Sequence, residues 1–262
     1  MKDKAKLFIG TNLKMYKNAG DTEEYLKKLE DLTRDIDRRD IELFVIPTFT
    51  SLERAANCVS RRYIKIGAQN MHWEEQGQYT GEVSPLMLKE IGVEIVEIGH
   101  SERRHVFGER DGDINRKVLS AIRHGFTALL CVGETLEQKE YGVSDEILGI
   151  QLKIGLNGLT AEDAKNLWIA YEPVWAIGVG GTPASADYAE EKHCVIKKIL
   201  IDLFGEAGEN VPVVYGGSVN LENSTEYLER RCVDGLFIGR SAWDAENFNR
   251  IIRKSLSCVF SK

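Results

Sequence analysis

The chain has 262 residues, enough for one large α/β domain whose core needs neither disulfides nor metals for stability. Its 34 Lys and Arg against 41 Asp and Glu give a formal net charge of −7, which argues against nucleic acid as a general partner. No apolar run approaches the roughly 20 residues of a membrane span, and the five cysteines are widely spaced without a CxxC pair. These features predict a cytoplasmic protein with reduced cysteines and no membrane partner.

Short aliphatic and β-branched runs recur along the chain, nearly continuous in apolar character, as strands covered on both faces should be. Segments of helical period lie between them, among them Glu23–Arg39 and Asp187–Phe204, with apolar residues three or four apart. Strands that alternate with helices predict a parallel sheet. The predicted strands are Lys6–Gly10, Glu42–Ile46, Ile64–Gly67, Val93–Ile98, Thr127–Val132, Leu167–Tyr171, Val211–Tyr215 and Gly235–Ile238.

Eight such units predict closure into a (β/α)8 barrel, and no Pro- or Ser-rich linker divides the chain, so residues 1–262 are expected to form a single domain. The alternative is an open doubly wound sheet. In a barrel, side chains after the strands form the active site. Polar groups follow four of the runs: Asn12-Leu13-Lys14, His100-Ser101-Glu102, Glu172-Pro173 and Gly216-Gly217-Ser218.

Glu172 ends a predicted strand, and Pro173 biases it toward extended geometry, so its side chain should leave the strand in a fixed direction. The apolar stretch that follows would raise the basicity of this carboxylate, which suits a general base. A solvated strand-end Glu is the alternative for an isolated case. Two further groups fit the same chemistry. Lys14 offers a positive charge for an enolate-like oxygen, and His100, at a strand–helix junction, could donate a hydrogen bond to a carbonyl as a neutral ring.

Metal binding is not predicted at His100-Ser101-Glu102. His-x-Glu is also part of a zinc deaminase signature, but its Pro-Cys-x-x-Cys partner is absent. The glycine-rich turns point instead to phosphate. Gly216–Ser218 and Gly235–Gly239 end the last two predicted strands, where barrels usually bind it. The segment Gly178–Gly181 lacks the ending of a P-loop and favours either a mobile lid or a plain surface loop.

Several stretches together resemble the triosephosphate isomerase family, and the likeness runs in order over essentially the whole chain. The segment Glu172-Pro173-Val174-Trp175-Ala176-Ile177-Gly178 is highly specific. The other stretches are Gly10-Thr11-Asn12-Leu13-Lys14-Met15, Ile98-Gly99-His100-Ser101-Glu102-Arg103-Arg104 and Tyr215-Gly216-Gly217-Ser218-Val219. The resemblance implies a TIM barrel that catalyses aldose–ketose isomerisation of a sugar phosphate through an enediolate, without cofactor or metal.

The resemblance also implies roles for individual residues. Glu172 would be the base and His100 the neutral electrophile, with Lys14 and Asn12 assisting. In this family the histidine is already known to be kept neutral by the N-terminus of a helix. Supporting positions would be Glu102 and Cys131. The phosphate contacts would be Gly178, Ser218, Gly239 and Arg240. The family is usually a homodimer, and the loop Gln76–Glu82 matches its interface loop, whose tip, Thr80, would reach the partner's site.

Departures from the family pattern concern the surroundings of these groups. Leu13 stands where Trp is usual, Gly181-Thr182-Pro183 replaces a Lys-Thr-Ala type hinge, His72-Trp73 adds bulk to the interface loop, and Arg240 replaces a second Gly. They resemble a subgroup that isomerises erythrulose phosphates in erythritol-type catabolism. The substrate is therefore expected to be a three- or four-carbon sugar phosphate, and the departures favour erythrulose phosphate. The alternatives are a triosephosphate isomerase of glycolysis and gluconeogenesis, and a non-catalytic phosphate-binding barrel.

Overall fold

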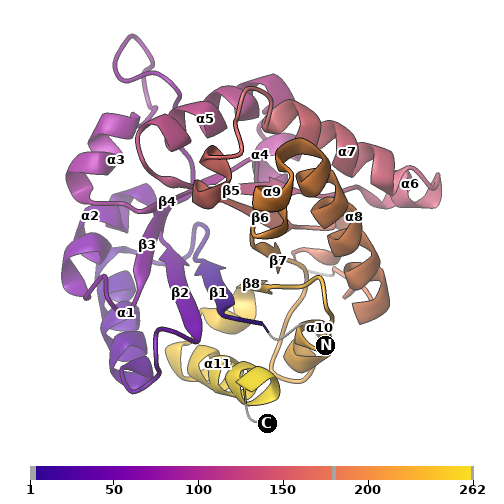
Figure 1. The fold of residues 1–262 in the computed structure, drawn as a ribbon. Coiled ribbons are helices and arrows are strands. Elements are labelled where there is room, and N and C mark those ends of the chain that lie inside the picture. Colours follow the sequence, from indigo (N-terminus) through magenta and orange to yellow (C-terminus); the bar gives the residue numbers. More distant parts are fainter. Residues whose placement is uncertain (1–3, 179–180, 261–262) are drawn as a thin grey trace.

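The computed structural model describes residues 4–178 and 181–260. Eight strands pair in parallel in chain order, and β8 also pairs with β1, so the sheet closes into a barrel (Figure 1). The predicted (β/α)8 barrel is confirmed, and the open doubly wound alternative is wrong. The strands are β1 (Leu7–Asn12), β2 (Ile41–Ile46), β3 (Lys65–Ala68), β4 (Ile95–Ile98), β5 (Thr127–Val132), β6 (Leu167–Tyr171), β7 (Val213–Tyr215) and β8 (Gly235–Ile238).

Helices surround the barrel on its outer side (Figure 1). They are α1 (Ala19–Thr33), α2 (Phe49–Cys58), α3 (Pro85–Ile91), α4 (Ser101–His105), α5 (Asp111–Arg123), α6 (Leu136–Glu140), α7 (Ser144–Gly155), α8 (Ala186–Phe204), α9 (Glu206–Glu209), α10 (Ser224–Leu228) and α11 (Ala245–Phe260). Short 3-10 turns occupy Asp163–Asn166, Val174–Ala176 and Arg240–Ala242. Among the described residues no helix is long and apolar enough to cross a membrane.

Several predicted boundaries differ from the structure, and two of the differences have local reasons. The first helix begins at Ala19 rather than Glu23, because the side chain of Asn18 caps it by accepting a hydrogen bond from the backbone amide of Asp21. It ends at Thr33 rather than Arg39. The strand predicted from Val211 starts at Val213, since Pro212 has no amide hydrogen to donate to a neighbouring strand.

The core has two layers. Residues on one face of each strand pack against the helices, and residues on the other face fill the barrel interior. The interior cluster is dominated by large side chains, among them Phe44, Trp168 and Phe237, and also includes Ile95 on β4 and Cys131 on β5. The barrel is therefore a packed body, and a substrate can reach the polar groups only at one of its ends.

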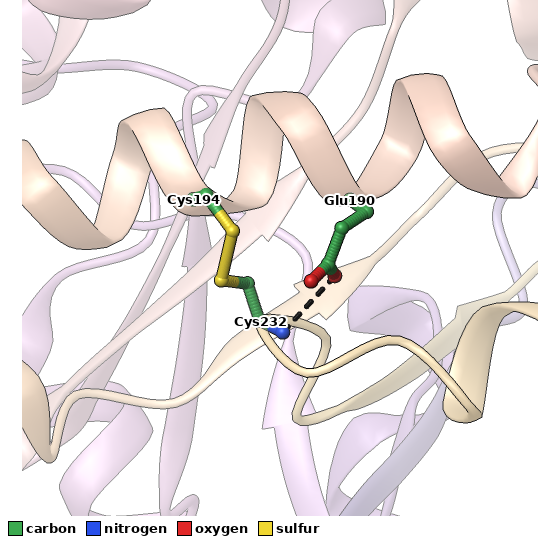
Figure 2. Close-up of side chains that lie close together, drawn as sticks. All are labelled: Glu190, Cys194 and Cys232. Carbon is green, nitrogen blue, oxygen red and sulfur yellow. Dashed lines mark hydrogen bonds between the residues drawn. A yellow bond between two sulfur atoms is a disulfide. The ribbon is translucent and has the colours of Figure 1, made fainter. Parts of the chain in front are cut away.

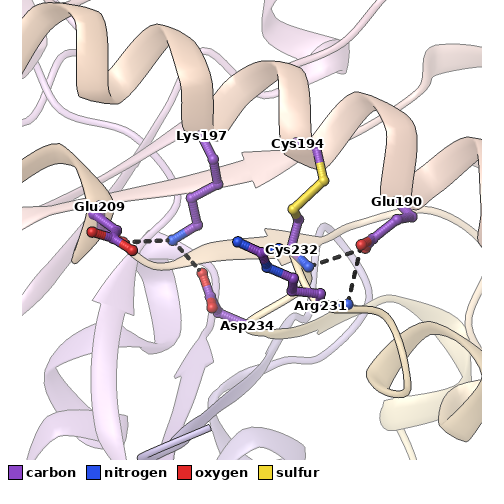
Figure 3. Close-up of a disulfide and its surroundings, with 7 residues drawn as sticks. All are labelled: Glu190, Cys194, Lys197, Glu209, Arg231, Cys232 and Asp234. Carbon is purple, nitrogen blue, oxygen red and sulfur yellow. Dashed lines mark hydrogen bonds and ion pairs between the residues drawn. A yellow bond between two sulfur atoms is a disulfide. The ribbon is translucent and has the colours of Figure 1, made fainter. Parts of the chain in front are cut away.

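The expectation that all the cysteines are reduced is wrong for one pair, because Cys194 on α8 and Cys232, just before β8, form a disulfide. Figure 2 shows the carboxylate of Glu190 beside it, accepting a hydrogen bond from the backbone amide of Cys232. The same carboxylate also accepts one from the backbone amide of Arg231 (Figure 3). Sequence spacing hid the pair, since 38 positions separate the two residues. The barrel topology brings α8 against the connection that leads into β8. Cys58, Cys131 and Cys258 are free.

The same seam contains a salt bridge. Lys197, one turn further along α8, pairs with Asp234 at 2.7 Å and also donates to the backbone carbonyl of Glu209 (Figure 3). Asp234 in turn accepts a hydrogen bond from the backbone amide of Val213 at the start of β7. Covalent and ionic contacts together fasten α8 to the segments that lead into β7 and β8.

Candidate active site

Glu172 follows β6 directly and is almost fully buried. Its amide donates to the carbonyl of Val132 at 2.7 Å. Glycines allow its close approach to the neighbouring strands: a Cβ on Gly133 would lie 1.9 Å from the Glu172 carbonyl oxygen, and one on Gly216 would lie 2.8 Å from its Cγ. The side chain is thus directed into the mouth of the barrel, as Pro173 and the strand end predicted.

His100 lies across the mouth from Glu172, before the N-terminus of α4. Its Nδ1 accepts a hydrogen bond from the Glu102 amide at 3.1 Å, so the ring proton is on Nε2. Nε2 lies 3.7 Å from Oε1 of Glu172, while Oε2 of Glu172 accepts a hydrogen bond from the Ser101 amide at 3.4 Å. A donor and a carboxylate therefore face each other in a buried site.

Lys14 is held in an unusual backbone conformation, with φ of 48° in the left-handed region. Its amide donates to Oδ1 of Asn12 at 2.6 Å, and its carbonyl accepts from the side chain of Gln69 at 2.9 Å. The ammonium group pairs with Glu102 at 2.7 Å. Partial burial opposes ionisation of Glu102, but the Lys14 hydrogen bond and charge outweigh it and hold the pKa of Glu102 below its usual value. This network fixes a cation at the mouth.

Buried carboxyl and thiol groups lie below these residues. Nδ2 of Asn12 donates to Glu97 at 2.7 Å. The Cys131 thiol lies 3.8 Å from the other Glu97 oxygen. Burial first, and the charge of Glu172 second, raise the pKa of Cys131 well above its usual value, so Cys131 remains a thiol.

The predicted phosphate contacts lie around the ends of β6, β7 and β8. The Ser218 hydroxyl donates to the Ala176 carbonyl at 2.8 Å, joining the β7 turn to the segment after β6. Gly178 has φ of 85°, which favours glycine. Gly239 precedes the 3-10 turn that starts at the exposed Arg240. Val179 and Gly180, in the predicted lid, lie outside the described residues. Thr80 is exposed on the connection between β3 and α3.

Four further residues support the site, and sequence reasoning missed three of them: Glu97, Gln69 and Glu134. Glu97 and Gln69 both bond to the side chain of Asn12. Trp243 donates from Nε1 to the Asn12 carbonyl at 2.9 Å. Glu134, fully buried, accepts from the side chains of Trp175 and Tyr188, on either side of the predicted lid. Glu97 had a signal in the sequence, since a charged residue interrupts the apolar run Val93–Ile98.

Two groups of side chains in the described part of the chain bring metal-ligand atoms within 4.8 Å of one another: Glu97, Cys131 and Glu172, and Glu190, Cys194 and Cys232. Neither offers a thiolate, which is the form of cysteine that binds metal. In the first group burial keeps the thiol protonated. In the second, the two sulfur atoms are bonded to each other. Neither donor set suits a resident ion.

A barrel with a carboxylate, an imidazole donor and a cation at its carboxyl end, beside glycine-bearing turns, defines a class of phosphate-ligand enzymes that work by proton transfer. A model of one family, described as triosephosphate isomerase, matches residues 7–255. The chain belongs to the triosephosphate isomerase family, as its motifs predicted.

Individual relatives agree with this assignment. An L-erythrulose-1-phosphate isomerase of Rhizobium etli is 44% identical over 254 residues, covering 97% of this chain and 94% of that protein. One of Brucella abortus is 43% identical over 256 residues, covering 97% and 98%. A triosephosphate isomerase of Carboxydothermus hydrogenoformans is 44% identical over 252 residues, covering 96% and 99%. Overall identity therefore does not separate the two kinds of relative.

Proposed function

We propose that this isomerase moves a carbonyl group between adjacent carbons of a small sugar phosphate, with Glu172 as the base and without a cofactor. The observation that carries the proposal is the 3.7 Å approach of His100 Nε2 to Glu172 Oε1 in a buried site. A substrate carbon placed at Glu172 could lose its proton there while the adjacent carbonyl oxygen accepts a hydrogen bond from Nε2.

The proton balance is internal to the enzyme and the substrate. Glu172 takes a proton from the carbon beside the carbonyl, a carbon–carbon double bond forms, and the carbonyl oxygen becomes an enediolate oxygen. The Lys14 ammonium and the Asn12 amide stabilise that charge, and His100 moves the hydroxyl proton between the two oxygens. Glu172 then returns its proton to the neighbouring carbon. The electrons stay within the substrate, so the reaction needs no oxidant.

The substrate we propose is a four-carbon ketose phosphate of the erythrulose type. Its support is local, because relatives of both kinds are equally similar. Trp243 donates a hydrogen bond to the backbone carbonyl of Asn12, and its ring packs at a tilt against that of Tyr16, with centroids 4.3 Å apart. Arg240, beside Gly239, adds a cation to the expected phosphate turn, where the proposed contacts are Gly178, Ser218, Gly239 and Arg240. Triose phosphates are the second candidate.

The test is a side-by-side measurement of kcat/KM with L-erythrulose 1-phosphate and with dihydroxyacetone phosphate. We expect the higher value with the four-carbon substrate. A clear preference for the triose would assign the chain to triose phosphates instead. Stabilisation by inorganic phosphate without turnover of either substrate would indicate a non-catalytic phosphate-binding barrel.

We further propose that the protein works as a cytoplasmic homodimer, in erythritol-type catabolism rather than in glycolysis or gluconeogenesis. Its Cys194–Cys232 disulfide is then unusual, since disulfides are rare in the cytoplasm. The connection between β3 and α3 supports the dimer. At its base, His72 stacks on Trp73 with ring centroids 4.2 Å apart. The His72 ring also packs at a tilt against Tyr79, at 4.1 Å, and Thr80 is exposed next to Tyr79. Light scattering on the purified protein tests this point, and a monomer that is fully active would contradict it.

A further inference from the structure

Glu97 is a carboxyl group inside the barrel that the mechanism above does not use. It lies two residues after Ile95 on β4, and Ile95 belongs to the interior cluster. Because alternate residues of a strand share a face, Glu97 also points inward. It is fully buried. A carboxyl group in such a place is costly unless it is hydrogen-bonded or protonated, so its contacts should reveal what it does.

Its strongest contact is with Asn12. The side-chain oxygen of Asn12, Oδ1, already accepts hydrogen bonds from the Lys14 backbone amide and from the Gln69 side chain, at 2.6 and 2.9 Å. The Asn12 amide nitrogen therefore needs an acceptor, and Glu97 Oε2 provides it at 2.7 Å. Both ends of the Asn12 amide are fixed in this way. The oxygen of the same amide accepts a hydrogen bond from the strained Lys14 backbone. Glu97 therefore helps to position the Lys14 cation indirectly, through Asn12.

The charge state of Glu97 follows from its neighbours. Its carboxyl lies within 4.8 Å of that of Glu172, and two buried carboxylates so close would repel each other strongly. Burial first, and the charge of Glu172 second, raise the pKa of Glu97 well above its usual value. The Asn12 bond and the Lys14 charge act against this, and Glu102 adds to it. The Cys131 thiol beside it brings no charge. Glu172 must be ionised to act as a base, so the proton belongs on Glu97.

Resting on the function proposed above, we propose that Glu97 is a positioning residue that works as a neutral carboxylic acid. It holds the Asn12 amide beneath the reacting carbons. Because it is neutral, it does not repel the negative charge of Glu172. The chemistry requires a side chain at position 97 that can accept a hydrogen bond without carrying a charge.

Two substitutions and one control test this role. Glu97→Gln keeps the shape and the acceptor of a neutral acid, so it should retain kcat within about threefold and leave the acid limb of the pH profile, which reports Glu172, in place. Glu97→Leu leaves the buried Asn12 donor unpaired, and kcat should fall roughly tenfold or more, with a smaller change in KM. Glu94→Gln removes a half-buried carboxyl just before the same strand and should change neither.

Three results would overturn the proposal. An acid limb that moves to lower pH in Glu97→Gln would mean that an anion had been removed. Wild-type kinetics in folded Glu97→Leu would mean that the Asn12 contact is idle. If Glu97→Leu does not fold, the infrared difference between wild type and Glu97→Gln at neutral pH decides: a band from a protonated carboxyl supports the proposal, and a carboxylate band contradicts it. All kinetics use whichever of the two substrates the wild type prefers. A wild type that turns over neither would refute the proposed function, while the infrared result would still decide the state of Glu97.

Discussion

The mouth of the barrel and the seam between α8 and β8 both hold ionisable side chains, but they arrange them differently. At the mouth, Glu172, His100 and Glu97 lie close together, but their polar groups satisfy one another only in part. Lys14 has a strained backbone there. In the α8 seam (Glu190, Cys194, Lys197, Cys232 and Asp234), each group has a matched partner: a disulfide, a 2.7 Å salt bridge, or a carboxylate bound to two backbone amides.

The difference separates chemistry from stability. Groups held ready for a reaction cannot also be fully neutralised by their neighbours, so an active site tends to cost stability. The α8 seam has no reaction to prepare, and its contacts can all favour the folded state. Variants at the mouth should therefore change rates, and variants at the seam should change the free energy of unfolding.

Replacing Glu172 by Gln removes the base and keeps the shape of the side chain. Loss of a general base should reduce kcat by roughly 10³-fold, equivalent to about 4 kcal/mol of barrier. The melting temperature should not fall, because a buried charge is also removed. Steady-state kinetics and thermal unfolding of the same preparation check both parts. If the variant retained a tenth of wild-type activity, a residue other than Glu172 would have to be the base.

Replacing both Cys194 and Cys232 by Ser should lower stability and leave the rate unchanged. The disulfide closes a loop of 38 positions, and losing such a crosslink lowers the free energy of unfolding by about 4 kcal/mol in the chain-entropy account. We expect kcat to be unchanged. Urea unfolding without reductant measures the effect, and Cys258→Ser, at a free cysteine, is the matched control. Equal stability of the double variant and wild type would mean that the seam is not fastened by this bond.

His193, on α8, makes the free energy of unfolding depend on pH. It is fully buried, and its ring meets that of Tyr171 edge-on at 5.6 Å. Burial lowers the pKa of His193 from the ordinary 6.5 to about 3. Between these values the unfolded chain binds a proton that the folded chain does not, so stability is lost as the pH falls below 6.5. The loss from this group should reach about 2 kcal/mol at pH 5.

The substitution His193→Phe keeps an aromatic ring at this position and removes the titration. Urea unfolding at pH 7 and pH 5 should then show a loss on acidification that is smaller than that of wild type by about the same 2 kcal/mol. His105→Phe, on α4, serves for comparison: partial burial and the charge of Arg104 also lower the pKa of His105, so this variant should remove a smaller part of the acid loss than His193→Phe does. An identical acid loss in His193→Phe and wild type would exclude His193 as the source.

The smallest effect is expected at Trp243. Phe at this position keeps an aromatic ring against Tyr16 and removes the hydrogen bond to the backbone carbonyl of Asn12. A hydrogen bond of this kind contributes about 1 kcal/mol, so kcat/KM should fall no more than about fivefold and the free energy of unfolding by no more than the same amount. Unchanged kinetics would show that the Asn12 segment does not depend on this support.

The sequence predicted the barrel well because the apolar runs and their helical spacers are local patterns. It also predicted which strand ends carry Asn12, Lys14, His100 and Glu172. The remaining features depend on long-range contact. Nothing near Cys194 indicates Cys232, and nothing near Gln69 shows that it binds the Lys14 backbone. The helix expected at Glu23–Arg39 was shifted because its cap, Asn18, precedes the periodic region. Glu97 alone among the missed groups could have been found, as a charge in a buried strand.

The most direct test of the account is isomerisation of L-erythrulose 1-phosphate in D2O by wild type and by Glu172→Gln, followed by proton NMR. If Glu172 transfers the proton, its carboxylic acid exchanges with solvent, and over many turnovers the wild type should place deuterium on the reacting carbon. The Gln variant, at equal concentration, should place essentially none in the same time. Deuterium incorporation by Glu172→Gln at the wild-type rate, or isomerisation by wild type without any incorporation, would contradict the account.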